Sequence, residues 1–379
     1  MGGIYQKTLD SLEYPKVLNE LANFSRCNYS KELCLKLLPE KKPEIIQTLL
    51  SFTKEALNIL NQAVDIPLEF VIDLSKIDFR PEYFEETELI DFSKTLRSSR
   101  LVKNFLRENS DSESLLFNLS KKLYVNKELE DTISDTFDEN YNVKHNATQT
   151  LSGLYSSLKD TEDNLKSTVT KLLNSPDFNK HLQEQIYTVR DDRIVFQVKA
   201  PSKNKIAGIV HDVSATNKTF YIEPNQIVPL NNKIREVKSK IHGEIISILT
   251  NLSREIKINL EDIKTSITVL GEIDFHFAKA RYAIKTQSVE PILETKKIIK
   301  LEKMRHPLLI GRVEHLVAND FSIGKDYHSV LITGSNTGGK TVAMKTIGLF
   351  LLMTNSGMFL PCAEAHIYPF KTVFADIGD

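Results

Sequence analysis

Apolar residues recur at helical spacing in the first third of the chain. Between Pro43 and Pro67 they lie at Ile46, Leu49, Leu50, Leu57 and Leu60. A second set follows Thr87, at Leu89, Phe92, Leu96 and Phe105. One apolar stripe along a helix is the pattern of a helix packed on a core. Because proline is tolerated in the first turn of a helix and ends one elsewhere, we predict a helical region over residues 1–122.

The period changes to two near residue 186. Tyr187–Val189 and Ile194–Val198 alternate apolar and polar residues, and Asp191-Asp192 lies between the two runs. Alternation on both sides of a short polar turn predicts a β-hairpin. Two more strands are predicted, at 206–210 and 219–222. We therefore expect a small β unit over about residues 186–224.

Helical spacing returns after the β unit. Nine apolar residues from Ile241 to Leu270 follow one another with a mean step of about 3.6 residues, the α-helical period. Residues 151–173 carry a shorter stripe of the same kind. We predict that the two helices pair antiparallel as an arm with the β unit at its end. An ordinary buried core helix is the alternative.

After about residue 286 the pattern is of α/β type. Strands are predicted at Leu308–Ile310, Val330–Thr333 and Val373–Ala375, and a helix at Thr341–Met353. A length of 379 residues favours more than one core. The predicted fold class is multidomain, mainly α with α/β. Its parts are a helical region, 1–122, a helical arm with a β tip, 123–285, and an α/β region, 286–379.

Charge is spread unevenly along a chain whose net charge is −1. Residues 107–140 hold four basic and nine acidic residues, whereas residues 185–260 hold twelve basic and seven acidic residues. The net +5 over the predicted β unit and the helix behind it marks a candidate surface for phosphate groups. An uneven but merely solvated surface is the alternative.

The sequence carries no signal for export or membrane insertion. Cys27, Cys34 and Cys362 lack the spacing of a metal site, so we expect them to be free thiols in a reducing compartment. The N-terminus lacks the plan of a signal peptide, and the longest apolar run, Ile347–Met353, is too short to span a bilayer. We therefore expect a cytoplasmic protein with no membrane partner.

The segment from Gly334 to Thr341 carries the clearest chemistry, because its letters GSNTGGKT match the phosphate-binding pattern G-x-x-x-x-G-K-[ST] in full. Glycines let successive backbone N–H groups face one phosphate, and the helix behind them adds its positive end. Lys340 supplies a cation for the terminal phosphates, and Thr341 supplies a hydroxyl for Mg²⁺. The predicted ligands are Mg²⁺ and ATP or a related nucleoside triphosphate. The predicted binding residues are Gly334, Ser335, Asn336, Thr337, Gly338, Gly339, Lys340 and Thr341.

Hydrolysis of ATP needs a second, acidic segment that holds Mg²⁺ and orients water. Asp376 follows the predicted strand Val373–Ala375, but no glutamate comes directly after it. We therefore expect ATP binding with essentially no turnover from these residues.

These residues resemble the MutS family. The glycine-rich segment from Gly334 to Thr341, with Thr333 before it, is close to the family's T-G-P-N-x-G-G-K-[ST] motif, with Ser335 in place of the usual proline. Arg305-His306-Pro307-Leu308 is similar to the segment that opens the family's ATPase domain. The match is closest to the second bacterial subfamily, MutS-two, and runs from about residue 7 to the end. Four segments of this chain resemble sequences typical of that subfamily: Leu96–Arg100, Gly208–Asp212, Phe220–Pro224 and Asn231–Glu236.

The resemblance implies a helical core with a lever arm, a clamp at the arm's tip, and a P-loop ATPase domain that begins near residue 286. It implies that Leu316 and Val317 pack on the adenine. It also implies a homodimer that clamps nucleic acid, with a role in DNA repair or recombination control on branched DNA, or at ribosomes and their rRNA. In the family, an acidic strand and a nuclease-type Smr domain follow, so we expect this chain to be a fragment that ends within the ATPase domain.

Basic residues of the predicted tip are the candidate nucleic-acid contacts. They are Arg190, Arg193, Lys199, Lys203, Lys205 and Lys218. As phosphate contacts they would bind without sequence preference. His211 and Asp212 invite an acid–base interpretation, but a structural turn is favoured because no third catalytic partner is visible. His306 is expected at the rim of the nucleotide pocket.

Three alternatives stay open at this point. The chain could be a nucleotide-binding remnant without turnover, an unrelated P-loop enzyme such as a kinase, or a structural coiled-coil protein with an incidental glycine-rich loop. The long apolar stripe and the MutS-two phrases disfavour the kinase. The strand–turn–helix context expected around Gly334 disfavours the coiled coil.

Overall fold

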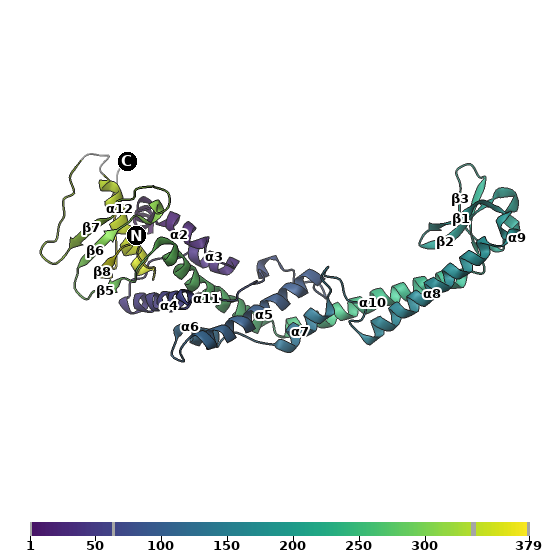
Figure 1. The fold of residues 1–379 in the computed structure, drawn as a ribbon, viewed down its shortest axis with the longest axis horizontal. Helices are drawn as coiled ribbons and strands as arrows, with labels where there is room; N and C mark the ends of the chain where they lie inside the picture. Colours follow the sequence, from purple (N-terminus) through teal and green to yellow (C-terminus); the bar gives the residue numbers. More distant parts are fainter. Residues whose placement is uncertain (1, 63–64, 335–338, 377–379) are drawn as a thin grey trace. The chain divides into compact units, whose positions relative to one another are not determined.

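The computed structural model describes residues 2–62, 65–334 and 339–376 (Figure 1). The chain divides into two compact units. The first comprises Met1–Ile77, Asp91–Asp131 and Ile258–Asp379, and the second Asp78–Ile90 and Thr132–Lys257. Within the described residues, each unit combines helices with one four-stranded sheet. The fold is thus multidomain and mixed, helical with two small sheets, as the sequence predicts.

The N-terminal region is helical, as its apolar spacing predicts. Pro43 is the first residue of its helix, and a later helix begins at Glu86, one residue before Thr87. The elements up to residue 136 are α1 (Gly2–Ser11), α2 (Tyr14–Ala22), α3 (Asn28–Leu35), α4 (Pro43–Asn61), η1 (Leu74–Lys76), α5 (Glu86–Asn109), α6 (Leu115–Ser120) and α7 (Lys127–Thr136).

α11 (Leu260–Thr286) is the central helix of the first unit, where it packs against α3, α4 and α6. The sequence predicts one helix across 241–270, and this prediction is wrong. α10 (Val228–Ile258) and α11 are separated by Asn259, whose side chain accepts a hydrogen bond from the Tyr124 hydroxyl at 2.8 Å. The missed signal is local, because asparagine followed by Glu261 and Asp262 is typical of a helix start.

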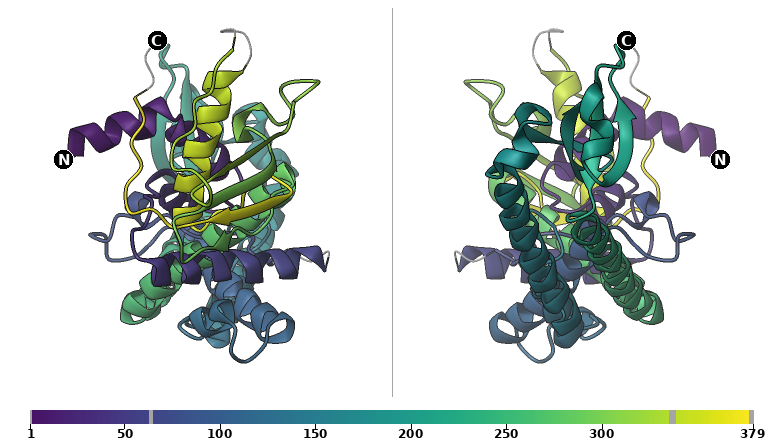
Figure 2. Two further views of the ribbon diagram at one scale, coloured as in Figure 1. Left: turned by 90° about the vertical axis from the view of Figure 1, so that its left-hand side faces the viewer. Right: turned by 90° about the vertical axis from the view of Figure 1, so that its right-hand side faces the viewer.

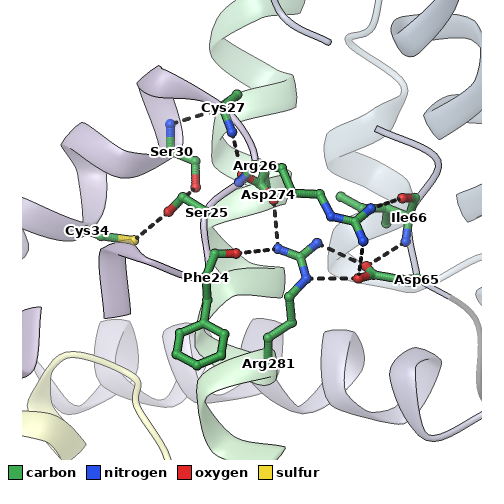
Figure 3. A network of polar contacts seen from close by, with 10 residues as sticks. All are labelled: Phe24, Ser25, Arg26, Cys27, Ser30, Cys34, Asp65, Ile66, Asp274 and Arg281. Atoms are coloured by element: carbon green, nitrogen blue, oxygen red, sulfur yellow. Dashed lines mark hydrogen bonds and ion pairs between the residues drawn. The ribbon is translucent and has the colours of Figure 1, made fainter. Parts of the chain in front are cut away.

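A polar network ties α11 to the segments around it (Figure 3). The fully buried Asp274 accepts hydrogen bonds from the backbone N–H groups of Arg26 and Cys27, at 2.6 and 3.2 Å. Arg281 donates to Asp274 and to Asp65, in each case at 2.9 Å. Arg26 also pairs with Asp65. A carboxylate withdrawn from water needs such partners, so the network fixes the loop before α3 onto α11.

The sheet of the first unit has the strand order β5-β8-β6-β7. β5 runs parallel to β8, and the other neighbours are antiparallel. The elements of this region are β5 (Ile292–Leu293), β6 (Ile299–Met304), η3 (Pro307–Leu309), β7 (Asn319–Ile323), α12 (Lys340–Asn355) and β8 (Glu364–Ile367). The helix predicted at Thr341–Met353 is confirmed by α12.

Three strand predictions in this region are wrong. Leu308–Ile310 overlaps η3, because Pro307 at the first position of η3 favours a helical turn. Val330–Thr333 and Val373–Ala375 have no regular structure, and Leu331 is 88% exposed. An apolar run becomes a strand where a neighbour supplies backbone hydrogen bonds, and no strand within the described ranges pairs with either run.

α12 shares one core with the sheet and with the N-terminal helices (Figure 2). Phe350 of α12, Leu301 of β6 and Leu12 are all buried in this core. Gly348 permits the close approach, because a Cβ atom at that position would lie 2.6 Å from Cδ2 of Leu12. The first and last described segments of the chain therefore pack together.

The second unit carries an antiparallel sheet with the strand order β1-β2-β4-β3. Asp191 and Asp192, with φ values of 49° and 61°, form the tight turn of the predicted hairpin, which is confirmed. The strands predicted at 206–210 and 219–222 appear with shifted bounds. The elements are α8 (Gln149–Leu173), α9 (Pro176–Asn179), β1 (Leu182–Arg190), β2 (Arg193–Lys199), η2 (Ala200–Lys205), β3 (Gly208–Val213) and β4 (Thr219–Pro224).

α8 and α10 run antiparallel within the second unit (Figure 1). Before α8, the Thr148 hydroxyl donates to Glu244 of α10 at 2.8 Å. Towards the other end of α8, Val169 shares a core with Ile234 of α10 and with Phe196 of the sheet. The sheet therefore packs where α8 ends and α10 begins. Across the described ranges, no helix has the length and apolar character needed to cross a membrane.

Candidate functional site

Both described glycines of the glycine-rich segment have positive φ values. Gly334 has φ 145°, and Gly339, directly before the helix, has φ 77°. A side chain strains the backbone in this region, so both positions favour glycine. The Ala343 N–H donates to the Gly339 carbonyl at 2.9 Å, so the intrahelical hydrogen bonds of α12 reach back to Gly339. The predicted residues Ser335, Asn336, Thr337 and Gly338 lie outside the described residues.

Lys340 folds back towards the start of the segment. Its Nζ donates a hydrogen bond to the carbonyl oxygen of Gly334. Thr341 is exposed in the first turn of α12. A lysine amine and a threonine hydroxyl thus lie at one helix N-terminus, where the helix dipole also favours negative charge.

Leu316 and Val317 lie in the irregular loop between η3 and β7. Leu316 is half-buried, whereas Val317 is 72% exposed. Val317 thus exposes an apolar side chain to solvent. Among the described residues, no hydrogen bond links Leu316 or Val317 to Gly334 or Lys340.

His306 precedes η3 and is buried. Burial lowers the pKa of His306, because the charged imidazolium loses its hydration, and Lys345 lowers it further while Glu13 raises it. His306 is therefore neutral at physiological pH. The charges of Glu13 and of Lys345, a residue of α12, both act on this buried ring.

The six predicted basic contacts all lie on the sheet of the second unit or beside it, and five of them are exposed. The Arg190 guanidinium lies 4.7 Å from the ring centre of Tyr221, and Lys203 lies 4.5 Å from that of Phe220. Lys199 donates to a backbone carbonyl at 3.4 Å. Lys205 and Lys218, in η2 and in the turn before β4, have no side-chain hydrogen bond or ion pair with another described residue.

Arg193 differs from the other five, because it belongs to an internal network. It donates to Glu223, whose side chain is fully buried, at 3.0 Å. His211 Nε2 lies 2.5 Å from the same carboxylate, and Asn231 Nδ2 donates to it at 2.8 Å. A buried carboxylate needs these partners, so the geometry gives His211 a structural role and adds Glu223, which the sequence did not single out. Asp212 lies 3.9 Å from Arg190.

The described part of the chain shows neither a candidate metal site nor an exposed thiol. It contains no group of three or more His, Cys, Asp or Glu residues with the geometry of a metal site. Cys27, Cys34 and Cys362 are buried free thiols, and burial raises the pKa of each.

Comparison with known proteins supplies the family. Residues 330–379 match the family model described as MutS domain V. The chain is 34% identical over 381 residues to endonuclease MutS2 of Acetivibrio thermocellus, covering 99% of this chain and 48% of that protein. Endonuclease MutS2 of Clostridioides difficile is 34% identical over 382 residues, and putative endonuclease MutS2 of Bacillus subtilis is 34% identical over 381 residues, with the same coverage. The chain spans about half the length of the curated relatives it matches.

The fold and the site define a multidomain protein in which a glycine-rich turn opens a helix packed on a small sheet. With these matches, the chain belongs to the MutS family and, within it, to the MutS2 subfamily. The resemblance drawn from the motifs is confirmed.

Proposed function

We propose that this chain binds ATP with Mg²⁺ at the start of α12 and holds nucleic acid with the sheet of its second unit, as part of a homodimer. In this proposal residues 1–122 form the core, 123–285 the lever arm with its clamp, and 286–379 part of the ATPase domain. DNA is the leading nucleic acid, because the family resemblance points to repair and recombination. Structured RNA of the ribosome is the competing outcome.

One observation carries the nucleotide part of the proposal. Gly334 and Gly339 have the left-handed φ values of a phosphate-binding turn, and Lys340 reaches back across that turn from the first position of α12. Thr341 would hold Mg²⁺ through its hydroxyl, and Ser335, Asn336, Thr337 and Gly338 would complete the cradle. Leu316 and Val317 would pack on the adenine.

Calorimetry of ATP binding tests this site with Lys340→Ala. Loss of a charged hydrogen bond to phosphate costs about 1.5–3 kcal/mol, so affinity should fall by roughly 10- to 150-fold. Lys325→Ala, which removes an exposed lysine outside the turn, serves as the matched control and should bind like wild type. Equal affinity of wild type and Lys340→Ala would refute the assignment.

The nucleic-acid part rests on the exposed cations of the second unit: Arg190, Lys199, Lys203, Lys205 and Lys218. Lysines in turns reach outward, and contacts to phosphate release counterions, so such binding weakens steeply as salt rises. Arg193 would support the surface from beneath through Glu223. The exposed lysines would grip the backbone of any branched duplex without choosing a sequence.

The salt dependence of binding to a branched DNA tests this surface. Changing Lys203, Lys205 and Lys218 together to glutamine should reduce the slope of log affinity against log salt by roughly 2–3. A triple change of Lys122, Lys296 and Lys297, exposed lysines of the first unit, is the control and should leave the slope unchanged. If the tip variant keeps the wild-type affinity and slope, this surface does not bind DNA. If it changes binding to structured RNA alone, RNA replaces DNA as the ligand.

A further inference from the structure

We propose that α2 is a bracket across the nucleotide site, in which Glu13 positions the phosphate-side helix α12 and Glu20 positions the base-side loop 311–317. Both would be positioning residues, because their carboxylates pair with Lys345 of α12 and with Arg312 of the loop and would act on the nucleotide through them. Glu13 directly precedes α2, and Glu20 lies within α2, seven positions further along the chain. The inference rests on the proposed nucleotide site and adds to it a support that the glycine-rich motif does not contain.

Glu13 lies between α1 and α2, in a backbone conformation that residues other than glycine rarely adopt. Its φ of 59° and ψ of 25° are left-handed, although it is not a glycine. Such strain persists where surrounding contacts hold it, and it gathers at functional sites. This conformation leaves the Glu13 carboxylate 3.3 Å from the Nζ of Lys345 on α12.

The Glu13–Lys345 pair lies directly behind the proposed phosphate-binding turn. Lys345 follows Lys340 and Thr341 by little more than one helical turn, and both side chains of the pair are about three-quarters buried. A hydrogen bond from Lys16 is the main cause that lowers the pKa of Glu13, and Lys345 adds to it. Glu13 is therefore ionised at neutral pH, and it links α2 to the first turns of α12.

Glu20 makes the corresponding link on the base side. Its Oε1 accepts a hydrogen bond from Nη2 of Arg312, within the loop that carries Leu316 and Val317. That loop has no regular structure, and the backbone N–H groups of Arg312 and Val313 turn back to Leu309. The ion pair to Glu20 is therefore a side-chain tether from this loop to a regular element.

The body of α2 is itself fixed on α12, so the two links act across a rigid support. The Tyr14 hydroxyl lies 2.6 Å from Oγ of Ser356, at the end of α12, and both residues are buried. Leu12 packs against Gly348, and η3 packs against α2. The buried His306 precedes η3 and experiences the charges of both Glu13 and Lys345. The spacing between the phosphate-side turn and the base-side loop would thus be set by one short helix.

The two halves of the bracket predict different ligand profiles. Glu13→Gln should weaken Mg²⁺-ATP and Mg²⁺-triphosphate alike, on the order of tenfold, because a charged hydrogen bond behind the phosphate-binding turn is lost. Glu20→Gln should weaken ATP by about two- to fivefold, the range for an exposed ion pair, and leave inorganic triphosphate unchanged, since triphosphate has no base. The double change Glu20→Arg with Arg312→Glu should restore ATP affinity.

Calorimetry on the full chain, with thermal midpoints measured in parallel, separates these outcomes. Glu32→Gln, which breaks the exposed pair of Glu32 with Lys36 on α3, is the control and should change neither ligand. If wild type binds ATP no better than Lys340→Ala, the nucleotide site fails and the bracket fails with it. If binding depends on Lys340 while Glu20→Gln weakens both ligands equally or neither, or the charge swap does not restore ATP affinity, the bracket is overturned and the nucleotide site stands.

Discussion

Replacing Lys279 by methionine should stabilise the first unit and remove part of its pH dependence. Lys279 lies on α11 and is 1% exposed, and within the described residues its Nζ has no hydrogen-bond partner. The ring of Phe275 faces the amine, with 4.7 Å between Nζ and the ring centre. A charged amine in such a place loses its hydration without a compensating bond. Burial therefore lowers the pKa of Lys279 to about 7.

The magnitude follows from proton linkage. In the unfolded chain the lysine keeps its proton up to its usual pKa of 10.5, whereas the folded chain releases it above about 7. The unfolded state binds more protons between these values, so the free energy of unfolding rises with pH across the window. At pH 7.5 the perturbed lysine costs about 4 kcal/mol, and from pH 7.5 to 8.5 the wild type should gain about 1 kcal/mol. Methionine fills similar space without a charge, so it should recover much of this cost.

Urea unfolding at pH 7.5 and 8.5, followed by circular dichroism, measures both effects. The window lies below the usual thiol pKa of 9.0, above which the buried cysteines would lower stability as pH rises. Lys285→Met, an exposed change on the same helix, is the control and should keep the wild-type pH dependence. If Lys279→Met is no more stable than wild type at pH 7.5 and retains the pH dependence, the amine has a partner in solution and the reasoning is wrong.

Two further changes test the polar networks of the first unit. Arg281→Met leaves the fully buried Asp274 without its ion pair and should cost about 3–5 kcal/mol in urea unfolding, against less than about 1 kcal/mol for the exposed Lys36→Met; a similar cost for both would show that the network carries little stability. The pKa of His366 is raised, first by its hydrogen bond to Glu364, so its stabilising effect is full below about pH 6.5 and is lost as pH rises through the folded pKa. His366→Gln should therefore be less stable than wild type at pH 6 and match it at pH 8.5, and identical differences at both pH values would contradict this.

The parts of the fold that the sequence predicts well are those that local chemistry determines. α12 follows from apolar spacing behind a glycine-rich turn, and the β1–β2 hairpin follows from alternation around Asp191-Asp192. Each of these patterns spans a few residues, and the backbone preferences of those residues decide the outcome. The glycines of the turn belong to the same class, because φ values above zero at Gly334 and Gly339 are a requirement that the sequence itself displays.

The wrong predictions concern segments whose structure depends on a residue or strand far away in the sequence. Val330–Thr333 has the composition of a strand, yet a strand needs a neighbour for its backbone groups, and composition does not reveal whether one is present. Residues 241–270 keep one helical stripe, but the side chain at which it breaks, Asn259, is held by Tyr124. Arg193 was grouped with the exposed cations because charge counts ignore orientation. Its partner Glu223 lies on β4, 30 residues away.

The contacts that hold α12 behind the proposed nucleotide site join residues even farther apart in the sequence. The motif specifies only the residues that would touch phosphate, whereas the position of α12 depends on contacts such as that between Tyr14 and Ser356, which are 342 residues apart in sequence. Contacts of that range form only after a large loop has been closed, so the turn reaches its final geometry when the core of the first unit is complete. A ligand that binds this geometry and not the unfolded chain must stabilise the same core. In the proposed site, nucleotide affinity therefore depends on how α2 packs on α12. Substitutions at Glu13 and Glu20, which lie far from the motif in sequence, test this positioning without removing a residue of the motif.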